Sequence, residues 1–325
     1  MTRLQCFVLL AATSALCFFS TVGAQTNDWP LKPIRIVTGF GPGSGADIIS
    51  RLLAERLAER LQMPVFVENR EGAASAIGTA VVARAPADGY TLLLGASTMT
   101  VNPHVQASAN YDPVKDFVPI IKVAQIPLLM ITASSAPYND LNELISHAKE
   151  NPGKLSYATS GNGSPSHLSV ELIRQATGIV VVGIPYKNVG QAMTDTLAGT
   201  VSFYFPAISA SVAQIQAGKA KGLVIGASKR SAKAPAVQTI SEQIKIEGLE
   251  VITWYGLFAP TGTPTEVTAR LYAETLAIMS TKEIQEKVIA AGMDLALANT
   301  EDFTLEVKAD NTKYEKLVRG LALQN

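Results

Sequence analysis

The chain has 325 residues, of which 47% are hydrophobic, and its 27 basic residues balance its 27 acidic residues. This length can bury an ample apolar core and is enough for two lobes. The even charge balance, without any basic stripe, excludes nucleic acid as a partner, and no stretch after residue 24 is long and apolar enough to span a membrane.

The first 24 residues carry the features of an export signal. Met1–Arg3 is a short basic start, Leu4–Phe19 is apolar, and Val22–Ala24 is a small-residue cleavage site. We therefore expect cleavage near Ala24 and a periplasmic protein. A membrane anchor is the alternative, although the apolar run is short for a bilayer span. Both cysteines lie in this segment, so the mature chain is expected to contain no disulfide.

The mature chain opens with a strand, a glycine-rich turn and a helix. Leu31–Val37 is predicted to be a buried strand, and Ala46–Leu61 an amphipathic helix. Glycines stand at positions 39, 41, 43 and 45 of the turn. Amides at a helix N-terminus lack partners within the helix, and glycine lets a ligand approach them. The turn therefore predicts a carboxylate or phosphate site, and a tight connection that binds nothing is the alternative.

Strands and helices continue to alternate through the next segment. Val65–Val67 and Tyr90–Leu94 are predicted strands, and Ala73–Ala85 is a predicted helix of small residues. The alternation predicts a parallel sheet that is covered on both faces. Ligands bind beyond the carboxyl ends of such strands, so the hydroxyls of Ser97 and Thr98 are candidates for contact, with a helix cap as their alternative role.

The middle of the chain repeats this opening pattern. Leu155–Ala158 is a predicted strand, a turn of glycines and hydroxyl residues follows it, and His167–Thr177 is a predicted helix. Two such turns in separate units predict that one anion is held from both sides. The position of His167 at a helix start favours a ligand or capping role over a hydrolytic triad with Ser160 or Ser164.

The remaining elements are predicted from hydrophobic periodicity and from start and stop signals. Strands are expected at 118–123, 128–132, 179–184, 201–205, 223–225 and 251–259. Helices are expected at 140–150, 193–198, 209–217, 265–280, 283–291 and 300–319. Lys229–Lys233 is a basic run that we expect to be solvated.

The first turn also fits a dinucleotide-binding fingerprint. Gly41–Ala46 matches G-x-G-x-x-G/A, and Glu68 ends the second strand about twenty residues later. A dinucleotide-dependent enzyme is therefore the alternative function. Export argues against it, and Pro42 removes a backbone donor from the turn. With no G-x-S-x-G motif and only scattered histidines, we expect no catalytic residue, no cofactor and no metal.

Longer motifs along the mature chain point to one family. They are Glu68–Arg70, Ala83–Leu92, Tyr111–Phe117, Tyr157–Gly163, Ser166–Leu168, Pro185–Lys187, Ala217–Lys219 and Trp254–Pro260. Together they resemble the Bug family of periplasmic solute-binding proteins, the receptors of tripartite tricarboxylate transporters. The resemblance covers essentially the whole mature chain.

This resemblance implies an α/β fold with two lobes, the type II-like periplasmic-binding-protein fold. Each lobe would hold a mainly parallel sheet flanked by helices, with the ligand cleft between the lobes. Lobe 1 would comprise residues 25–124 and 250–325, and lobe 2 residues 125–249. The resemblance also implies a receptor that captures a small organic mono- or dicarboxylate and delivers it to membrane transporter subunits. We expect this receptor to be a monomer. A ligand sensor for a signalling partner is a further alternative.

The resemblance places the ligand carboxylate against both glycine-rich turns and against a tyrosine wall. With Ser97 added from the sheet edge, the expected ligand-binding residues are Phe40, Gly41, Gly43, Ser44, Gly45, Ala46, Asp47, Ser97, Thr159, Ser160, Gly161, Asn162, Gly163, Ser164, His167 and Tyr186. Neither turn contains an arginine, so uncharged donors are expected to hold the carboxylate. Many family members have an Asp-Asn pair where this chain has Pro206-Ala207, which favours a plain mono- or dicarboxylate over an amino acid.

Overall fold

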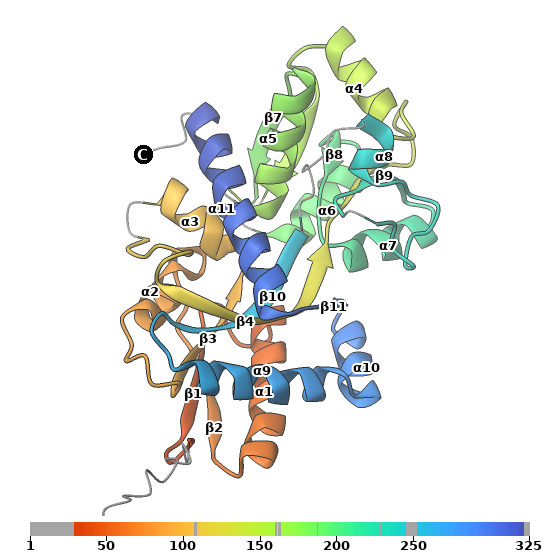
Figure 1. The fold of residues 1–325 in the computed structure, drawn as a ribbon. Coiled ribbons are helices and arrows are strands. Elements are labelled where there is room, and N and C mark those ends of the chain that lie inside the picture. The colour runs from red at the N-terminus through yellow and green to blue at the C-terminus, as the bar shows by residue number, and fades with distance from the viewer. Residues whose placement is uncertain are drawn as a thin grey trace, which may run out of the picture.

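The computed structural model describes residues 29–106, 109–159, 161, 164–186, 188–227, 229–244 and 252–321. The predicted export signal lies outside these residues. The described part of the chain forms two lobes, each with its own sheet and flanking helices (Figure 1). Within these ranges, none of the helices combines the length and the apolar character that a bilayer span requires.

The first lobe is built on a six-stranded sheet with the order β11-β4-β10-β3-β1-β2. Its strands are β1 Ile34–Thr38, β2 Val65–Asn69, β3 Thr91–Ala96, β4 Phe117–Pro127, β10 Ile252–Pro260 and β11 Asp294–Ala298. β1 pairs in parallel with β2 and β3, whereas β10 pairs antiparallel with both β3 and β4. β1, β2, β3 and β4 therefore share one direction, and β10 opposes them.

The second lobe is built on a five-stranded sheet with the order β7-β6-β8-β5-β9. Its strands are β5 Leu129–Ala133, β6 Ser156–Thr159, β7 Val182–Pro185, β8 Phe203–Tyr204 and β9 Ala220–Ile225. β6 pairs in parallel with β7 and β8, whereas β5 is antiparallel to β8 and β9.

Both sheets are thus mainly parallel, as predicted, but each also contains a strand that runs antiparallel to its neighbours. In each lobe the strand that opposes the parallel set is the first one after the chain crosses from the other lobe. β5 follows β4 directly, and β10 follows the elements of the second lobe. β11 also runs against β4 and was not predicted. The predicted bounds of the two lobes stay a prediction. β4 still pairs with β10 at Pro127, which lies opposite Ile252 and beyond the predicted bound after residue 124.

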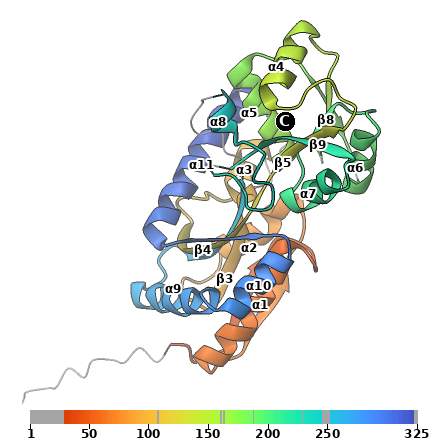
Figure 2. The same ribbon diagram turned by 90° about the vertical axis from the view of Figure 1, so that its right-hand side faces the viewer.

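Helices cover both sheets (Figures 1 and 2). The first lobe has α1 Gly45–Leu61, α2 Ala76–Ala83, α3 Thr98–Val105, α9 Thr265–Met279 and α10 Lys282–Ala290. The second has α4 Leu141–Glu150, α5 Pro165–Thr177, α6 Val189–Leu197, α7 Ile208–Gln216 and α8 Ile240–Ile244. α3 and α8 were not predicted from the sequence.

The helix predicted over 73–85 is interrupted near its start. Residues 73–75 form a 3₁₀ turn, η1 Ala73–Ser75, in which φ is 47°, 50° and 80°. This segment lies so close to the first turn that a Cβ on Gly39 would stand 2.6 Å from the Ser75 carbonyl oxygen. The 3₁₀ turn that interrupts the helix is therefore packed closely against the backbone at Gly39. Local helix propensity could not predict this interruption.

One helix, α11 Thr300–Leu321, belongs to both lobes (Figures 1 and 2). Near its start, Phe303 packs edge-on against Trp254 of β10, with ring centroids 5.1 Å apart. Near its end, Tyr314 and Leu317 are buried in the hydrophobic core of the second lobe. The Nε2 of Gln175 at the end of α5 also donates to the Leu317 carbonyl, at 3.3 Å. α11 therefore joins the two cores along one side of the molecule.

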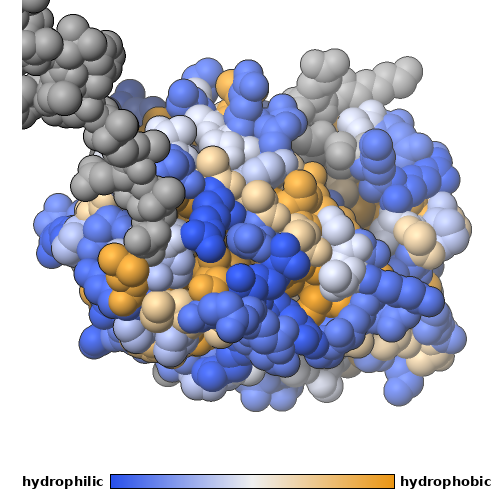
Figure 3. Space-filling view, turned by 60° about the horizontal axis from the view of Figure 1, so that its bottom comes forward, coloured by the Kyte–Doolittle hydropathy of each residue, from blue (hydrophilic) through white to orange (hydrophobic). Residues whose placement is uncertain are grey.

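The outer face of the first lobe is mainly hydrophilic, with apolar residues scattered over it (Figure 3). Ion pairs join its helices there. Arg56 of α1 contacts Glu283 of α10 at 2.7 Å, and Arg60 pairs with Glu274 of α9. These pairs fix the C-terminal end of α1 on the outer side of the lobe, so its N-terminus points inward.

Candidate ligand site at two helix N-termini

The first glycine-rich turn ends in a capped helix. Ser44 is the N-cap of α1, with φ −69° and ψ 160°, and its hydroxyl oxygen accepts from the Asp47 amide at 3.2 Å. The Ser44 amide donates to the Gly41 carbonyl at 3.2 Å, and the Ile48 amide donates to the Ser44 carbonyl at 2.9 Å. The turn is thus closed by its own backbone and by one serine side chain.

The second turn has the same geometry. Ser164 is the N-cap of α5, with φ −68° and ψ 155°, and its hydroxyl oxygen accepts from the His167 amide at 3.3 Å. The Ser164 amide donates to Gly161 at 3.2 Å, and the Leu168 amide donates to Ser164 at 2.9 Å. The strand, turn and helix pattern that the sequence repeats is therefore present, with the same three hydrogen bonds in both turns. Pro165 occupies the place that Gly45 has in the first turn.

The two turns differ in the amide donors that they leave available. In the first turn the amide of Gly43 donates to Asp47 Oδ2 at 2.9 Å, while those of Gly45 and Ala46 have no hydrogen-bond partner among the described residues. In the second turn Pro165 has no N–H to offer. The first turn is therefore the stronger candidate for an anion site, because two adjacent amides at a helix N-terminus remain available.

Asp47 holds the first turn in place. Asp47 is 3% exposed, and its side chain accepts from Gly43, from Asn69 Nδ2 at 2.9 Å and from Arg51 Nε at 2.9 Å. Burial alone would raise the pKa of this carboxyl, but the hydrogen bonds from Arg51, Asn69 and Gly43 outweigh burial and lower it. An ionised carboxylate fully engaged by its neighbours stabilises the turn and positions the amides beside it.

Tyr255 adds a donor that the sequence analysis did not select. A Cβ on Gly45 would stand 2.9 Å from Tyr255 Oη, so glycine is required for this close approach. Tyr255 is 7% exposed, and its hydroxyl has no hydrogen-bond partner among the described residues. Burial raises its pKa to about 12, which keeps the phenol a neutral donor. The sequence did offer one signal for Tyr255, namely a tyrosine within a predicted apolar strand. The hydroxyl of a buried tyrosine normally needs a hydrogen-bond partner, and a ligand can be that partner.

The other candidates of the first lobe have uncharged side chains, but the Glu71 carboxylate lies beside Gly41. The Phe40 carbonyl accepts from Asn69 Nδ2 at 2.9 Å, and a Cβ on Gly41 would stand 2.9 Å from Glu71 Oε2. Ser97 lies beyond the carboxyl end of β3, is buried, and donates its amide to the Trp254 carbonyl at 3.2 Å. The hydroxyl of its neighbour Thr98 is 2.9 Å from Ser75 Oγ, which ties it to η1.

In the second lobe the hydroxyls of the turn bond to one another. Thr159 Oγ1 lies 2.9 Å from Ser164 Oγ and accepts from the Gly161 amide at 3.2 Å. The ring of His167 is buried and stacks on Tyr157 at 6.4 Å, and burial lowers its pKa. The hydroxyl of Tyr186 donates to Asp195 at 2.8 Å. Three further candidates lie outside the described residues: Ser160, Asn162 and Gly163.

α1 begins after the carboxyl end of β1 and α5 after the carboxyl end of β6, so each glycine-rich turn lies at the carboxyl edge of the sheet of its own lobe. At its other end α5 contacts α11, where Gln175 donates to the Leu317 carbonyl. The lobes also touch through Lys233, whose Nζ contacts Asp294 at 2.8 Å and the Met293 carbonyl at 3.3 Å. The expectation that this basic run is merely solvated was therefore wrong for Lys233.

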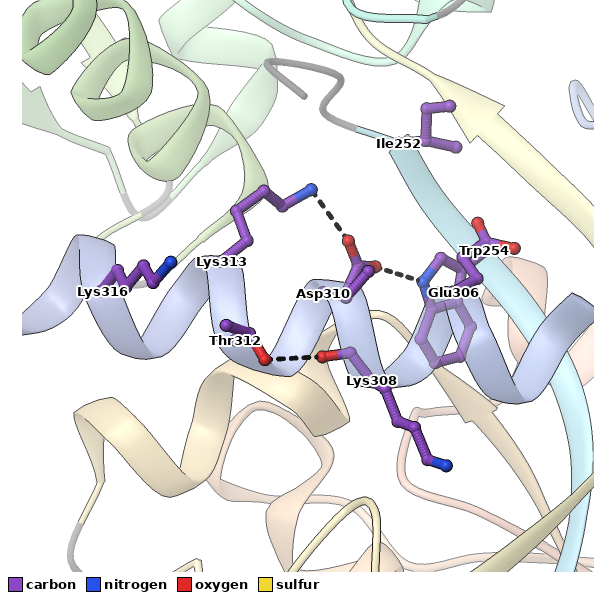
Figure 4. Close-up of a pocket in the computed structure, with 9 residues that line it drawn as sticks. Ile252, Trp254, Glu306, Lys308, Asp310, Thr312, Lys313 and Lys316 are labelled. Carbon is purple, nitrogen blue, oxygen red and sulfur yellow. Dashed lines mark hydrogen bonds and ion pairs between the residues drawn. The ribbon is translucent and has the colours of Figure 1, made fainter. Parts of the chain in front are cut away.

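A separate cavity of about 590 Å³ lies between β10 and α11 (Figure 4). Its acidic groups already have partners. Asp310 accepts from Trp254 Nε1 at 2.7 Å and contacts Lys313 at 2.8 Å, and Glu306 contacts Lys122 at 2.6 Å. These contacts bind α11 to the strands that continue between the lobes. The cavity is therefore part of the connection between the lobes and contains neither glycine-rich turn.

Comparisons with known proteins identify relatives of this chain. The profile of the tripartite tricarboxylate transporter family receptor matches residues 49–323. Protein BugT of Bordetella pertussis is 34% identical over 313 residues, which cover 95% of this chain and 94% of BugT. The structure of the periplasmic binding protein BugD is 32% identical, with a TM-score of 0.71, and covers 91% of this chain and 99% of that one. The structure of Rpa4515 from R. palustris with adipate is 31% identical, with a TM-score of 0.72, and the match covers 90% of this chain and 97% of that one.

Proposed function

The chain belongs to the tripartite tricarboxylate transporter receptor family, and on this premise we propose that it is a periplasmic, monomeric receptor for a small organic carboxylate. It captures the carboxylate between its lobes and delivers it to the membrane subunits of a transporter. The adipate named with one structural neighbour supports a ligand of this class.

The observation that carries the proposal is the donor set at the start of α1. The amides of Gly45 and Ala46 and the hydroxyl of Tyr255 lie together, and none of the three has a partner among the described residues. Donors of this kind contribute roughly 1.5–3 kcal/mol each to an ionised acceptor. Three of them supply about 4.5–9 kcal/mol, against the roughly 8 kcal/mol of micromolar binding. The hydroxyls of the second turn, which bond to one another in this structure, would turn to the anion and add to these contacts.

The proposed ligand-binding residues fall into two groups. Gly45, Ala46 and Tyr255 contact the carboxylate, while Ser44 and Asp47 hold the turn that presents them. From the other lobe, the turn that ends at Ser164 approaches the same anion. Closure of the lobes would bring the two groups together, as in other hinged binding proteins.

The alternative of a dinucleotide-dependent enzyme finds less support. Glu68, the acid expected to bind a ribose, contacts Arg35 at 2.8 Å and also pairs with Arg70. Those ion pairs lower its pKa, despite burial that opposes the shift, and occupy its oxygens. We therefore propose a receptor without a catalytic role.

Calorimetry against a panel of carboxylates and nicotinamide dinucleotides tests this proposal. We expect micromolar binding of at least one plain carboxylate and no binding of NAD or NADP. Tight dinucleotide binding, with no carboxylate bound, would overturn the receptor assignment.

A further inference from the structure

We propose that an apolar cavity in the second lobe takes the body of the ligand, so that the receptor selects a monocarboxylate with an apolar chain or ring and no ammonium group. The cavity measures about 420 Å³, lies between α6, α7 and the end of β8, and is open to solvent along Val189, Ala210 and Ala213, which are exposed. Its lining includes Val189, Met193, Tyr204, Pro206, Ala207 and Ala210. This inference rests on the proposed function and narrows its substrate class.

The cavity adjoins the second glycine-rich turn through the sheet. β8 pairs in parallel with β6, where Ala158 is opposite Tyr204, so the carboxyl ends of both strands lie at one edge. β6 leads there into the turn that begins after Thr159, and β8 leads into Pro206. The Pro206 carbonyl accepts from the Leu129 amide at 3.0 Å, which fixes this corner of the cavity beside the crossing strand β5. A ligand anchored at the turns can therefore extend into it.

The chemistry of the lining excludes a second charge on the ligand. No described residue that lines the cavity carries a charged side chain, and only Tyr204 and Gln214 have polar ones. Asp195, an acid on α6, already accepts from Tyr186 at 2.8 Å and from Gln191 at 2.7 Å. An ammonium group in the cavity would thus gain no carboxylate partner, and a second carboxylate would gain no cation.

Tyr204 provides one neutral donor in this apolar setting. It is 5% exposed, and its hydroxyl has no hydrogen-bond partner among the described residues. Burial raises its pKa, so it remains protonated at neutral pH. Every methylene that a ligand buries against the apolar lining is expected to raise affinity about fourfold.

Four ligands of graded structure test the inference by calorimetry: propanoate, hexanoate, adipate and norleucine. We expect hexanoate to bind at least 10-fold more tightly than each of the other three. Adipate or norleucine binding equal to or tighter than hexanoate would overturn the apolar pocket while leaving the receptor proposal intact. Binding of none of the four would contradict both, and a dinucleotide control then identifies the alternative function.

A charge placed in the cavity gives the matched test. Ala210→Asp puts a carboxylate into the lining, and Gln216→Asp adds the same charge to α7 outside it. We expect Ala210→Asp to weaken hexanoate at least 10-fold and to remove its advantage over norleucine, with the melting temperature unchanged. Gln216→Asp should leave both affinities within twofold. Unchanged hexanoate binding in a folded Ala210→Asp variant would contradict the assignment.

Discussion

Tyr255→Phe tests the donor set at α1 with the smallest possible change. The substitution removes one hydroxyl, which stands 2.9 Å from the position of a Cβ on Gly45 and has no hydrogen-bond partner among the described residues. Because no internal bond is lost, we expect the free energy of unfolding to stay the same or to rise slightly. Loss of a donor to an ionised carboxylate costs roughly 1.5–3 kcal/mol, which weakens binding about 10- to 150-fold.

Calorimetry measures this effect, and urea unfolding checks the fold. Tyr314→Phe is the matched control, because Tyr314 is 3% exposed, also has a pKa raised to about 12 by burial, and lies near the end of α11. The control should bind carboxylate normally. The pKa of about 12 further predicts that wild-type affinity stays level between pH 7 and pH 10, since Tyr255 remains a donor throughout. A stable Tyr255→Phe variant with wild-type affinity would refute the reasoning.

Three further predictions concern the turns and the contact between the lobes. Asp47→Asn should lower the free energy of unfolding by about 1–3 kcal/mol in urea; because the pKa of Asp47 is depressed in the folded state, wild-type stability should fall as pH drops below about 4, and the variant should lack that component. His167→Phe should reduce the loss of stability below about pH 6.5, because burial lowers the pKa of His167 and only the unfolded state gains its proton there; an identical pH profile would contradict this. Lys233→Ala removes an ion pair whose side chains are 26% and 30% exposed, so the free energy of unfolding should change by no more than about 1 kcal/mol. Because this ion pair joins the two lobes, X-ray scattering of the ligand-free variant should show a larger radius of gyration than that of the wild type.

The sequence predicted best what is decided locally. The strand, glycine-rich turn and helix around Ser44 and around Ser164 follow from glycine, hydroxyl residues and apolar spacing within about twenty residues, whereas their N-cap roles were not predicted. The structure reproduces both turns with the same set of hydrogen bonds. Helix periodicity likewise located α1, α4 and α9 to within a few residues.

What the sequence left open depends on distant contacts. Tyr255 reaches Gly45 only because β10 returns from the second lobe to lie beside β3. Lys233 finds Asp294 across the lobes, and no local pattern links the two residues. The positive φ values at 73–75 accompany packing against Gly39, where local propensity favours a helix.

The most direct test of the central claim is an amide NMR titration of isotope-labelled protein with hexanoate and adipate. If the carboxylate is held at the start of α1, the amide signals of Gly45 and Ala46 should shift with the same dissociation constant that calorimetry gives. They should shift only at higher ligand concentration in Tyr255→Phe. Saturated binding that leaves both amide signals unmoved would contradict the account.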